Sequence, residues 1–227
     1  MQFELINHFK KAVFSIVFVG FSALSLTAMA GVYDDFFAAV KRNHDSTIQS
    51  ALARGFDVNT PGPNGENGLS MALFEESDKV VQVLMAWPKT DVNALNSKGE
   101  SPLMIAALRG QQDMATRLIK KGADINKTGW TPLHYAASAG KLALINLLIE
   151  NNAYIDAESP NGTTPLMMAA MYGTGDAVNL LLREGADATL KNKQGMTALQ
   201  FAQRGERPDA IKSLSNPAAV MLAKPRG

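Results

Sequence analysis

The sequence predicts an all-α fold in which short helix–turn–helix units stack side by side into a solenoid. Two observations lead to this prediction. A triplet that is typical of a helix start recurs about every 33 residues along most of the chain. Between successive triplets, leucine and isoleucine recur at helical spacing, and glycine, asparagine or aspartate follows them. Each unit is therefore expected to contain two helices and a projecting turn.

The first 30 residues have the pattern of a secretory signal peptide. Lys10 and Lys11 precede a run from Ala12 to Ala30 that contains no charged residue. The run ends in Ala28-Met29-Ala30, which places small residues at the two positions that a signal peptidase recognises. We therefore expect cleavage between Ala30 and Gly31 and no stable membrane insertion afterwards. A retained membrane anchor is the alternative, because the run is almost long enough to span a bilayer.

Six triplets mark the expected starts of the first helix in each unit. All begin with Asp, Asn, Ser or Thr, whose side-chain oxygen caps a helix N-terminus. Their first residues are Asp34, Asn67, Ser101, Thr131, Thr164 and Thr197, so the steps are 33, 34, 30, 33 and 33 residues. The triplets divide the chain into an N-terminal cap at residues 31–66, four central units at 67–196 and a C-terminal cap at 197–216. Residues 217–227 are expected to form a short flexible tail.

The rest of each unit also follows a pattern. Alanine pairs such as Ala136-Ala137 follow the triplet, and small side chains there let neighbouring helices approach closely. Glycine is expected to end this first helix at Gly110, Gly140 and Gly173, in keeping with its preference just past a helix C-terminus. Second helices are expected around Val80–Leu84, Met114–Ile119, Leu142–Ile149 and Ala177–Leu182.

Two units depart from the period. The step from Ser101 to Thr131 is three residues short, and the loss falls in Asn126-Lys127-Thr128-Gly129. The projecting finger there is expected to be stunted. In the second unit, Trp87-Pro88-Lys89-Thr90 replaces the usual glycine end of a helix and adds one residue. A bulge is expected at that point.

The fourth unit resembles the ankyrin repeat. Thr131-Pro132-Leu133-His134-Tyr135-Ala136-Ala137 is similar to the signature of that family, and Gly140 and Leu147-Leu148 continue the pattern. The resemblance extends from Tyr33 to about Leu214. It implies an ankyrin-repeat solenoid of about six units, with degenerate end units because one face of each meets water. With the predicted signal peptide, the chain resembles an exported bacterial ankyrin-repeat protein.

Charge and cysteine content exclude several classes of function. The first 30 residues hold two of the 22 basic and one of the 21 acidic residues, so the mature chain is close to neutral. Binding to nucleic acid depends on an excess of Lys and Arg, and we expect no nucleic-acid partner. The chain has no cysteine, which excludes disulfides and thiolate or zinc–thiolate chemistry.

His134 is the first candidate for chemistry, because the chain has only three histidines. A metal or acid–base site needs partner residues, and the other units place Phe37, Ser70, Met104, Met167 and Gln200 in the same slot. The resemblance implies a structural histidine that forms hydrogen bonds near the Thr131 cap. His8 lies in the predicted signal peptide, and His44 is expected to be solvated.

The remaining candidates for chemistry are weaker still. Known zinc-protease, phosphate-binding and nucleophile-elbow motifs are absent. Gly173-Thr174-Gly175 fits a turn between helices, and the adjacent carboxylates Asp34-Asp35 and Glu75-Glu76 point in different directions on a helix. We therefore expect no catalytic residue, no metal site and no cofactor, and the chain is predicted not to be an enzyme.

The resemblance implies that partners bind on the concave face, which the fingers and first helices form. Large apolar side chains are expected to gather there, and aromatic residues and methionine are enriched at interfaces. The predicted partner-binding residues are Trp130, Tyr135, Met168, Met171, Tyr172, Phe74 and Leu108. Packing between repeats is the alternative for such positions, and we expect it for Ile105 and Phe201.

These observations predict a monomeric, non-enzymatic module that binds a partner protein outside the cytoplasm, most simply in the periplasm. It would shield, inhibit or scaffold that partner. One alternative is a scaffold tethered to the inner membrane by an uncleaved N-terminus, and another is secretion from the cell. A groove for a small molecule or an enzymatic reaction is the third alternative.

Overall fold

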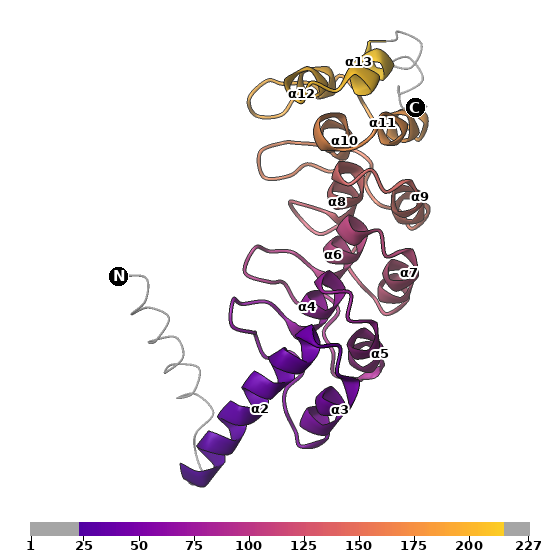
Figure 1. The fold of residues 1–227 in the computed structure, drawn as a ribbon. Coiled ribbons are helices and arrows are strands. Elements are labelled where there is room, and N and C mark those ends of the chain that lie inside the picture. The colour runs from indigo at the N-terminus through magenta and orange to yellow at the C-terminus, as the bar shows by residue number, and fades with distance from the viewer. Residues whose placement is uncertain (1–22, 216–227) are drawn as a thin grey trace, which may run out of the picture.

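The computed structural model describes residues 23–215, which form helices joined by loops and contain no strand. The helices come in pairs, one pair for each predicted unit (Figure 1). Their bounds are α2 Ala23–Lys41, α3 Asp45–Ala53, α4 Gly68–Phe74, α5 Asp78–Ala86, α6 Pro102–Arg109, α7 Gln112–Lys120, α8 Pro132–Ser138, α9 Leu142–Glu150, α10 Pro165–Tyr172, α11 Gly175–Arg183, α12 Ala198–Arg204 and α13 Pro208–Leu214. The predicted all-α repeat architecture is confirmed. The predicted tail at 217–227 lies outside the described residues.

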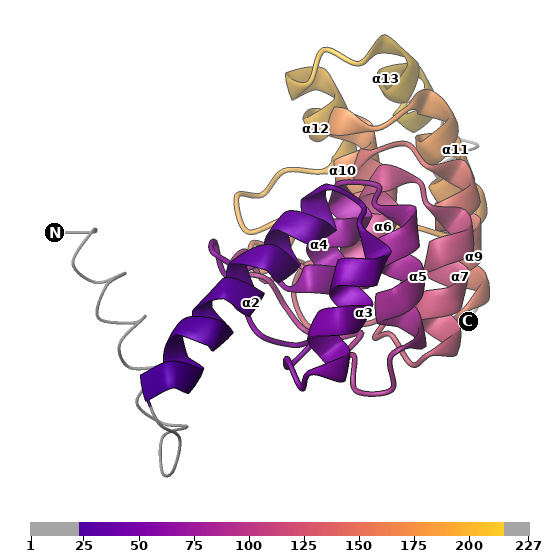
Figure 2. The same ribbon diagram turned by 60° about the horizontal axis from the view of Figure 1, so that its bottom comes forward.

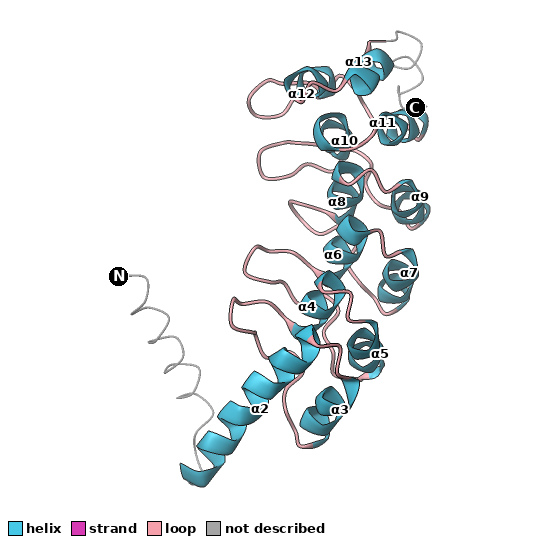
Figure 3. Ribbon diagram, viewed as in Figure 1, coloured by secondary structure: helices cyan, strands magenta, loops and turns pink. Residues whose placement is uncertain are grey.

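The helices form two columns. The first helices of the units pack on one another in the order α2, α4, α6, α8, α10 and α12, and the second helices form the outer column from α3 to α13. Figure 3 shows long loops, the fingers, projecting from the side of the first column. The outer column bows away from the fingers in Figure 1, so the fingers and first helices line the concave side. The view in Figure 2 shows how far α2 extends beyond the array at its N-terminal end.

Five of the six predicted helix starts are confirmed. Asn67, Ser101, Thr131, Thr164 and Thr197 each occupy the cap position immediately before an inner helix. The Asn67 side chain accepts a hydrogen bond from the Ser70 N–H at 2.7 Å, which satisfies one of the free donors at the helix start. The residue three positions after the cap reaches back: Gln200 Oε1 accepts from the Thr197 N–H at 2.8 Å.

The sixth predicted helix start, Asp34, is wrong. Helix α2 begins at Ala23 and continues without a break through Asp34, which is exposed on its surface. The segment from Ala23 to Ala30 contains no proline or glycine and is rich in alanine and leucine, so nothing in it stops a helix that extends upstream. The predicted cleavage site between Ala30 and Gly31 therefore lies within α2. The predicted signal peptide up to residue 22 lies outside the described residues.

Within residues 23–215, none of the helices is long and apolar enough to cross a bilayer. This statement includes α2, which has 19 residues.

The turn between the two helices of a unit requires a left-handed residue in most units. Gly110 with φ 77° and Gly140 with φ 63° supply it at two of the predicted glycine ends. Gly173 also ends its helix as predicted, but with φ −80° it is not left-handed. A Cβ at Gly173 would run into the Ala137 carbonyl oxygen and lie 2.9 Å from Ala169 Cα. Gly173 is therefore needed for the close approach of α8 and α10.

Both predicted irregularities are present. The backbone of Trp87 is extended at the end of α5, and the Thr90 hydroxyl donates to the Leu84 carbonyl at 2.6 Å to close the bulge. Four fingers are closed by a backbone hydrogen bond, such as Asn96 N–H to Glu100 O at 3.0 Å and Ser159 N–H to Thr163 O at 3.0 Å. Residues 126–130 have no such bond in the described chain, which confirms the stunted third finger.

Candidate functional site

His134 is completely buried in α8, and both ring nitrogens have partners. Nδ1 accepts a hydrogen bond from the Thr131 N–H at 3.2 Å, and Nε2 lies 2.8 Å from the Thr163 carbonyl oxygen of the next unit. Because Nδ1 accepts and a carbonyl can only accept, the proton of the neutral ring is on Nε2. The ring thus ties the start of α8 to the chain entering α10. The prediction of a structural histidine is confirmed.

Burial sets the protonation state of His134. Removal of the ring from water lowers its pKa to about 4, although the hydrogen bond to the Thr163 carbonyl acts in the opposite direction. The ring is therefore neutral at pH 7. Nothing in this arrangement resembles an acid–base or metal site, and no group of three or more His, Cys, Asp or Glu in residues 23–215 is arranged to hold a metal ion.

Trp130 lies at the base of the stunted finger, immediately before the Thr131 cap. Its ring is half-buried and meets the His134 ring edge to face, with the centroids 5.2 Å apart. Tyr135 follows one turn into α8 and is also half-buried. The structure therefore brings these two predicted residues together in one unit.

The next unit supplies three more of the predicted residues. Helix α10 packs directly against α8 and carries Met168, Met171 and Tyr172. Tyr172 is 57% exposed, whereas Met168 and Met171 are half-buried. The expected burial of Ile105 and Phe201 between repeats is confirmed, since they are 4% and 7% exposed.

The two segments that carry these five residues contain no side chain with a formal charge at neutral pH. No Asp, Glu, Lys or Arg occurs between Thr128 and Gly140 or between Ser159 and Gly175. These two segments contain α8 and α10 with the turns that flank them. We call the surface of the five residues the neutral patch, and its side chains are Trp130, Tyr135, Met168, Met171 and Tyr172. Depletion of charge in the centre with enrichment of aromatic residues and methionine is typical of protein interfaces.

Phe74 and Leu108 are on α4 and α6, nearer to the N-terminal end of the array. Phe74 is 50% exposed, and the guanidinium of Arg109 lies over its ring, 5.2 Å from the centroid. Arg109 also forms an ion pair with Glu76 at 2.5 Å. Phe74 therefore lies beside an ion pair and outside the neutral patch, and Leu108 is half-buried on α6, which packs against α8.

A carboxylate that the sequence did not single out borders the neutral patch. Glu100 ends the second finger and occupies the same position before its cap as Trp130 does in the next unit. The Tyr135 hydroxyl donates to Glu100 Oε1 at 3.0 Å, and Asn96 Nδ2 donates to Oε2 at 2.8 Å. Burial and the nearby Glu100 charge raise the pKa of Tyr135, so its hydroxyl stays protonated and continues to donate.

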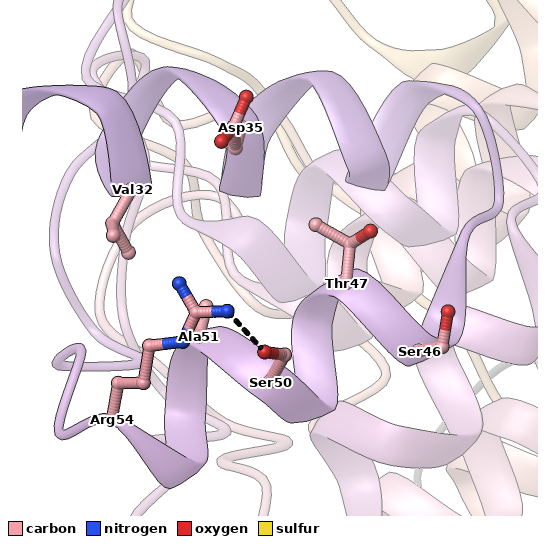
Figure 4. A pocket seen from close by; sticks show the side chains of 7 residues that line it. All are labelled: Val32, Asp35, Ser46, Thr47, Ser50, Ala51 and Arg54. Carbon is pink, nitrogen blue, oxygen red and sulfur yellow. Dashed lines mark hydrogen bonds between the residues drawn. The ribbon is translucent and has the colours of Figure 1, made fainter.

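Two hollows lie away from the neutral patch. Figure 4 shows the first, of about 380 Å³, between α2 and α3; it is lined by Val32, Asp35, Ser46, Thr47, Ser50, Ala51 and Arg54. Arg54 Nη2 donates to Ser50 Oγ at 2.8 Å on the α3 side of this hollow. The second, of about 480 Å³, is lined by residues of α11 and α13 with Thr174. Neither hollow contains a predicted partner-binding residue.

Several exposed apolar side chains were not among the predicted partner-binding residues. Tyr154, which follows α9, is 68% exposed, Leu95 on the second finger is 49% exposed, and Leu142 at the start of α9 is 38% exposed. They lie in separate places, and single exposed apolar residues are common on protein surfaces.

A family model described as ankyrin repeats (3 copies) matches residues 36–128, 69–159 and 155–223. The chain belongs to the ankyrin-repeat family. Its repeats are 28% identical over 123 residues to Neurogenic locus notch homolog protein 2 of Homo sapiens. This alignment covers 53% of this chain and 5% of the human protein. They are 36% identical over 75 residues to Ankyrin repeat and SAM domain-containing protein 6 of Rattus norvegicus. That alignment covers 31% of this chain and 8% of the rat protein.

The chain spans between 4% and 20% of the length of the curated relatives that it matches. The shared part is thus an ankyrin-repeat segment, which is in general a non-enzymatic module for protein–protein interaction.

Among solved structures, the chain is similar to one chain of the complex of the predatory endopeptidase Bd0816 from Bdellovibrio bacteriovorus with the immunity protein Bd3460. The TM-score is 0.68 and the identity 28%, and the match covers 80% of this chain and 96% of that chain. This likeness extends over most of the solenoid. That complex joins an endopeptidase and an immunity protein.

Proposed function

We propose that this ankyrin-repeat protein is exported from the cytoplasm and binds one partner protein through the neutral patch, without catalysing a reaction. The patch is the observation that carries the proposal. It consists of four large side chains on the packed helices α8 and α10 and of Trp130 just before α8, and its segments hold no charged residue. Desolvation of these two segments by a partner removes apolar area from water without burying a charge of their own.

The structural likeness supports inhibition or shielding as the consequence of binding. The similar chain comes from a complex between an endopeptidase and an immunity protein. We propose by analogy that the partner is another exported protein, whose active surface the solenoid covers. The periplasm is the proposed compartment.

Placement of charge near the predicted cleavage site supports processing. In a chain that begins at Gly31, Asp34 and Asp35 would lie in the first turn of the shortened α2. Acidic side chains stabilise the first turn of a helix through the helix dipole. In the uncleaved helix the same residues lie in the middle, where they gain nothing from the dipole.

A tethered scaffold is the second candidate function. The continuity of α2 from Ala23 to Lys41 favours it, because an uncleaved N-terminal segment would be joined rigidly to the first repeat.

Capture of partners from the cell envelope tests the binding function. The bait is the protein as the cell produces it, compared with a Trp130→Ala/Tyr172→Ala double variant and with Arg183→Ala. Arg183 is exposed on α11 in the outer column and serves as the matched control. We expect one envelope protein to be captured by the wild type and by Arg183→Ala and to be lost from the double variant. Equal capture by all three baits, with equal circular dichroism spectra, would contradict the proposal.

A further inference from the structure

Glu100 is held in a fixed position beside the neutral patch. Its two carboxylate oxygens accept hydrogen bonds from Tyr135 of the next unit and from Asn96 of its own finger. The Glu100 backbone N–H also donates to Asn96 Oδ1 at 2.9 Å, so backbone and side chain are both anchored. A carboxylate fixed in this way loses little conformational entropy when a partner binds it.

The charge of Glu100 has no counterion among residues 23–215. The only ion pair in that range joins Arg109 to Glu76. Lys98, on the same finger, is exposed, and its backbone N–H rather than its ammonium group engages Asn96. The two hydrogen-bond donors to Glu100 are neutral, and each carboxylate oxygen keeps a further lone pair. A half-buried carboxylate with unused acceptor capacity therefore lies at the border of an uncharged apolar surface.

We propose that Glu100 is the specificity anchor of the partner-binding face and that it receives an arginine or lysine side chain of the partner protein. This inference rests on the proposed function, because it names the chemistry of the partner at the same face. A protein that covered the neutral patch would remove Glu100 from water as well. An unpaired buried charge is strongly unfavourable, so the partner must supply a cation at this point. Arginine fits best, because its planar guanidinium can bind two carboxylate oxygens at once.

The stunted third finger favours this arrangement. Glu100 and Trp130 occupy equivalent positions in adjacent units, and the finger that ends at Trp130 is three residues short. A partner segment that approaches Trp130 therefore meets Glu100 one repeat away, without a full-length loop in between. The partner's basic residue is expected next to the apolar side chains that cover Trp130 and Met168.

Selection from a displayed library of random peptides tests the inference without knowledge of the partner. The target is the immobilised wild-type protein, and the selected peptides are then measured against Trp130→Ala, Glu100→Gln and Glu66→Gln. Glu66 occupies the equivalent position one unit earlier and is the matched control. We expect peptides that depend on Trp130 to share an arginine or lysine at one position. We also expect them to bind Glu100→Gln about tenfold more weakly, on the scale of a hydrogen bond to a charged group.

Charge reversal separates recognition from a merely structural role of Glu100. Selection on Glu100→Lys should yield peptides with Asp or Glu at the position that was basic, and circular dichroism should show an unchanged fold. Trp130-dependent peptides with no basic preference, or with equal affinity for Glu100→Gln, would overturn the inference and leave the binding face intact. Selected peptides that bind Trp130→Ala as tightly as the wild type would count against the proposed function itself.

Discussion

At the scale of single residues, the third position after each cap decides how an inner helix begins. Met104 and Met167 accept the N–H of their caps with sulfur at 3.3 and 3.4 Å, and Gln200 accepts with an amide oxygen. His134 does the same with Nδ1 and adds a second hydrogen bond to Thr163 of the next unit. The histidine is therefore one of several acceptors that fit this slot, and the only one of these four with a hydrogen bond across the repeat boundary.

Replacement of His134 by methionine is expected to lower the free energy of unfolding by about 1 kcal/mol at pH 7.5, the scale of one lost hydrogen bond. Methionine keeps the acceptor for the cap, as in two other units, but cannot donate to the Thr163 carbonyl. Chemical denaturation of both proteins measures the difference. A loss above about 3 kcal/mol would show that the ring has further roles in packing.

The same pair of proteins is expected to differ in pH dependence. The pKa of His134 is about 4 in the folded chain, against an ordinary value of 6.5. As the pH falls, the imidazole of the unfolded chain is therefore protonated before that of the folded chain. The stabilising contribution of the neutral ring is therefore complete above pH 6.5 and is lost as the pH falls towards 4. The stability advantage of the wild type over His134→Met should shrink over that interval. A difference that stays constant from pH 7.5 to 4.5 would contradict the burial argument.

Single residues also show the limits of prediction from sequence. The structural role of His134 could be predicted because no ligand or acid–base partner recurs near it. Glu100 could not be found, because its importance comes from Asn96 and Tyr135, which belong to different units and form no motif. Asp34 was misassigned as a cap because its triplet fits the period, although the chain before it also favours a helix.

At the scale of elements, a row of polar side chains links each unit to the next. Asn93 Nδ2 donates to the Gly122 carbonyl at 3.0 Å, and Asn93 Oδ1 accepts from the Asp124 N–H at 2.8 Å. Asn59 and Asn126 form the same pair of bonds one unit before and one unit after. Asp156 replaces asparagine in the next link and, when ionised, can accept from the Asp187 N–H but cannot donate.

Substitution of Asp156 by asparagine is expected to raise the free energy of unfolding by about 1 kcal/mol at neutral pH. The amide would restore the missing donor, directed at the Gly185 carbonyl, and would remove a half-buried charge. Burial raises the pKa of Asp156 above the ordinary value of 3.8, so the folded chain favours the protonated carboxyl. The stability that this protonated carboxyl contributes is complete below pH 3.8 and is lost as the pH rises through the folded pKa. The advantage of the variant should therefore shrink on acidification. An unchanged or lower stability of Asp156→Asn at pH 7.5 would contradict this account.

The order of elements and two of its irregularities were predictable, whereas the role of Gly173 was not. Caps and leucine spacing located the inner and outer helices because each unit must bury one apolar face against its neighbours. Gly173 was predicted to end its helix because glycine is preferred just past a helix C-terminus. Its actual reason, the approach of the Ala137 carbonyl, depends on how α8 packs on α10, and periodicity carries no information about that distance.

At the scale of the whole molecule, the account requires an exported chain that begins at Gly31. N-terminal sequencing of protein from the cell envelope measures this directly. We expect Gly31 as the first residue and recovery in the soluble fraction. An intact Met1 in the membrane pellet would favour the tethered scaffold instead.

The central claim is that the neutral patch is the binding site, and the affinity of the captured partner tests it most directly. Calorimetric titration is expected to show that Trp130→Ala and Tyr172→Ala each weaken binding by about 2 kcal/mol or more, the scale of aromatic hot spots. Arg183→Ala, in the outer column, should bind as the wild type does, and circular dichroism should show the same fold for all four proteins. Unchanged affinity of both patch variants, with folding intact, would contradict the account and direct attention to the fingertips at Pro61–Gly65 or Lys191–Gln194.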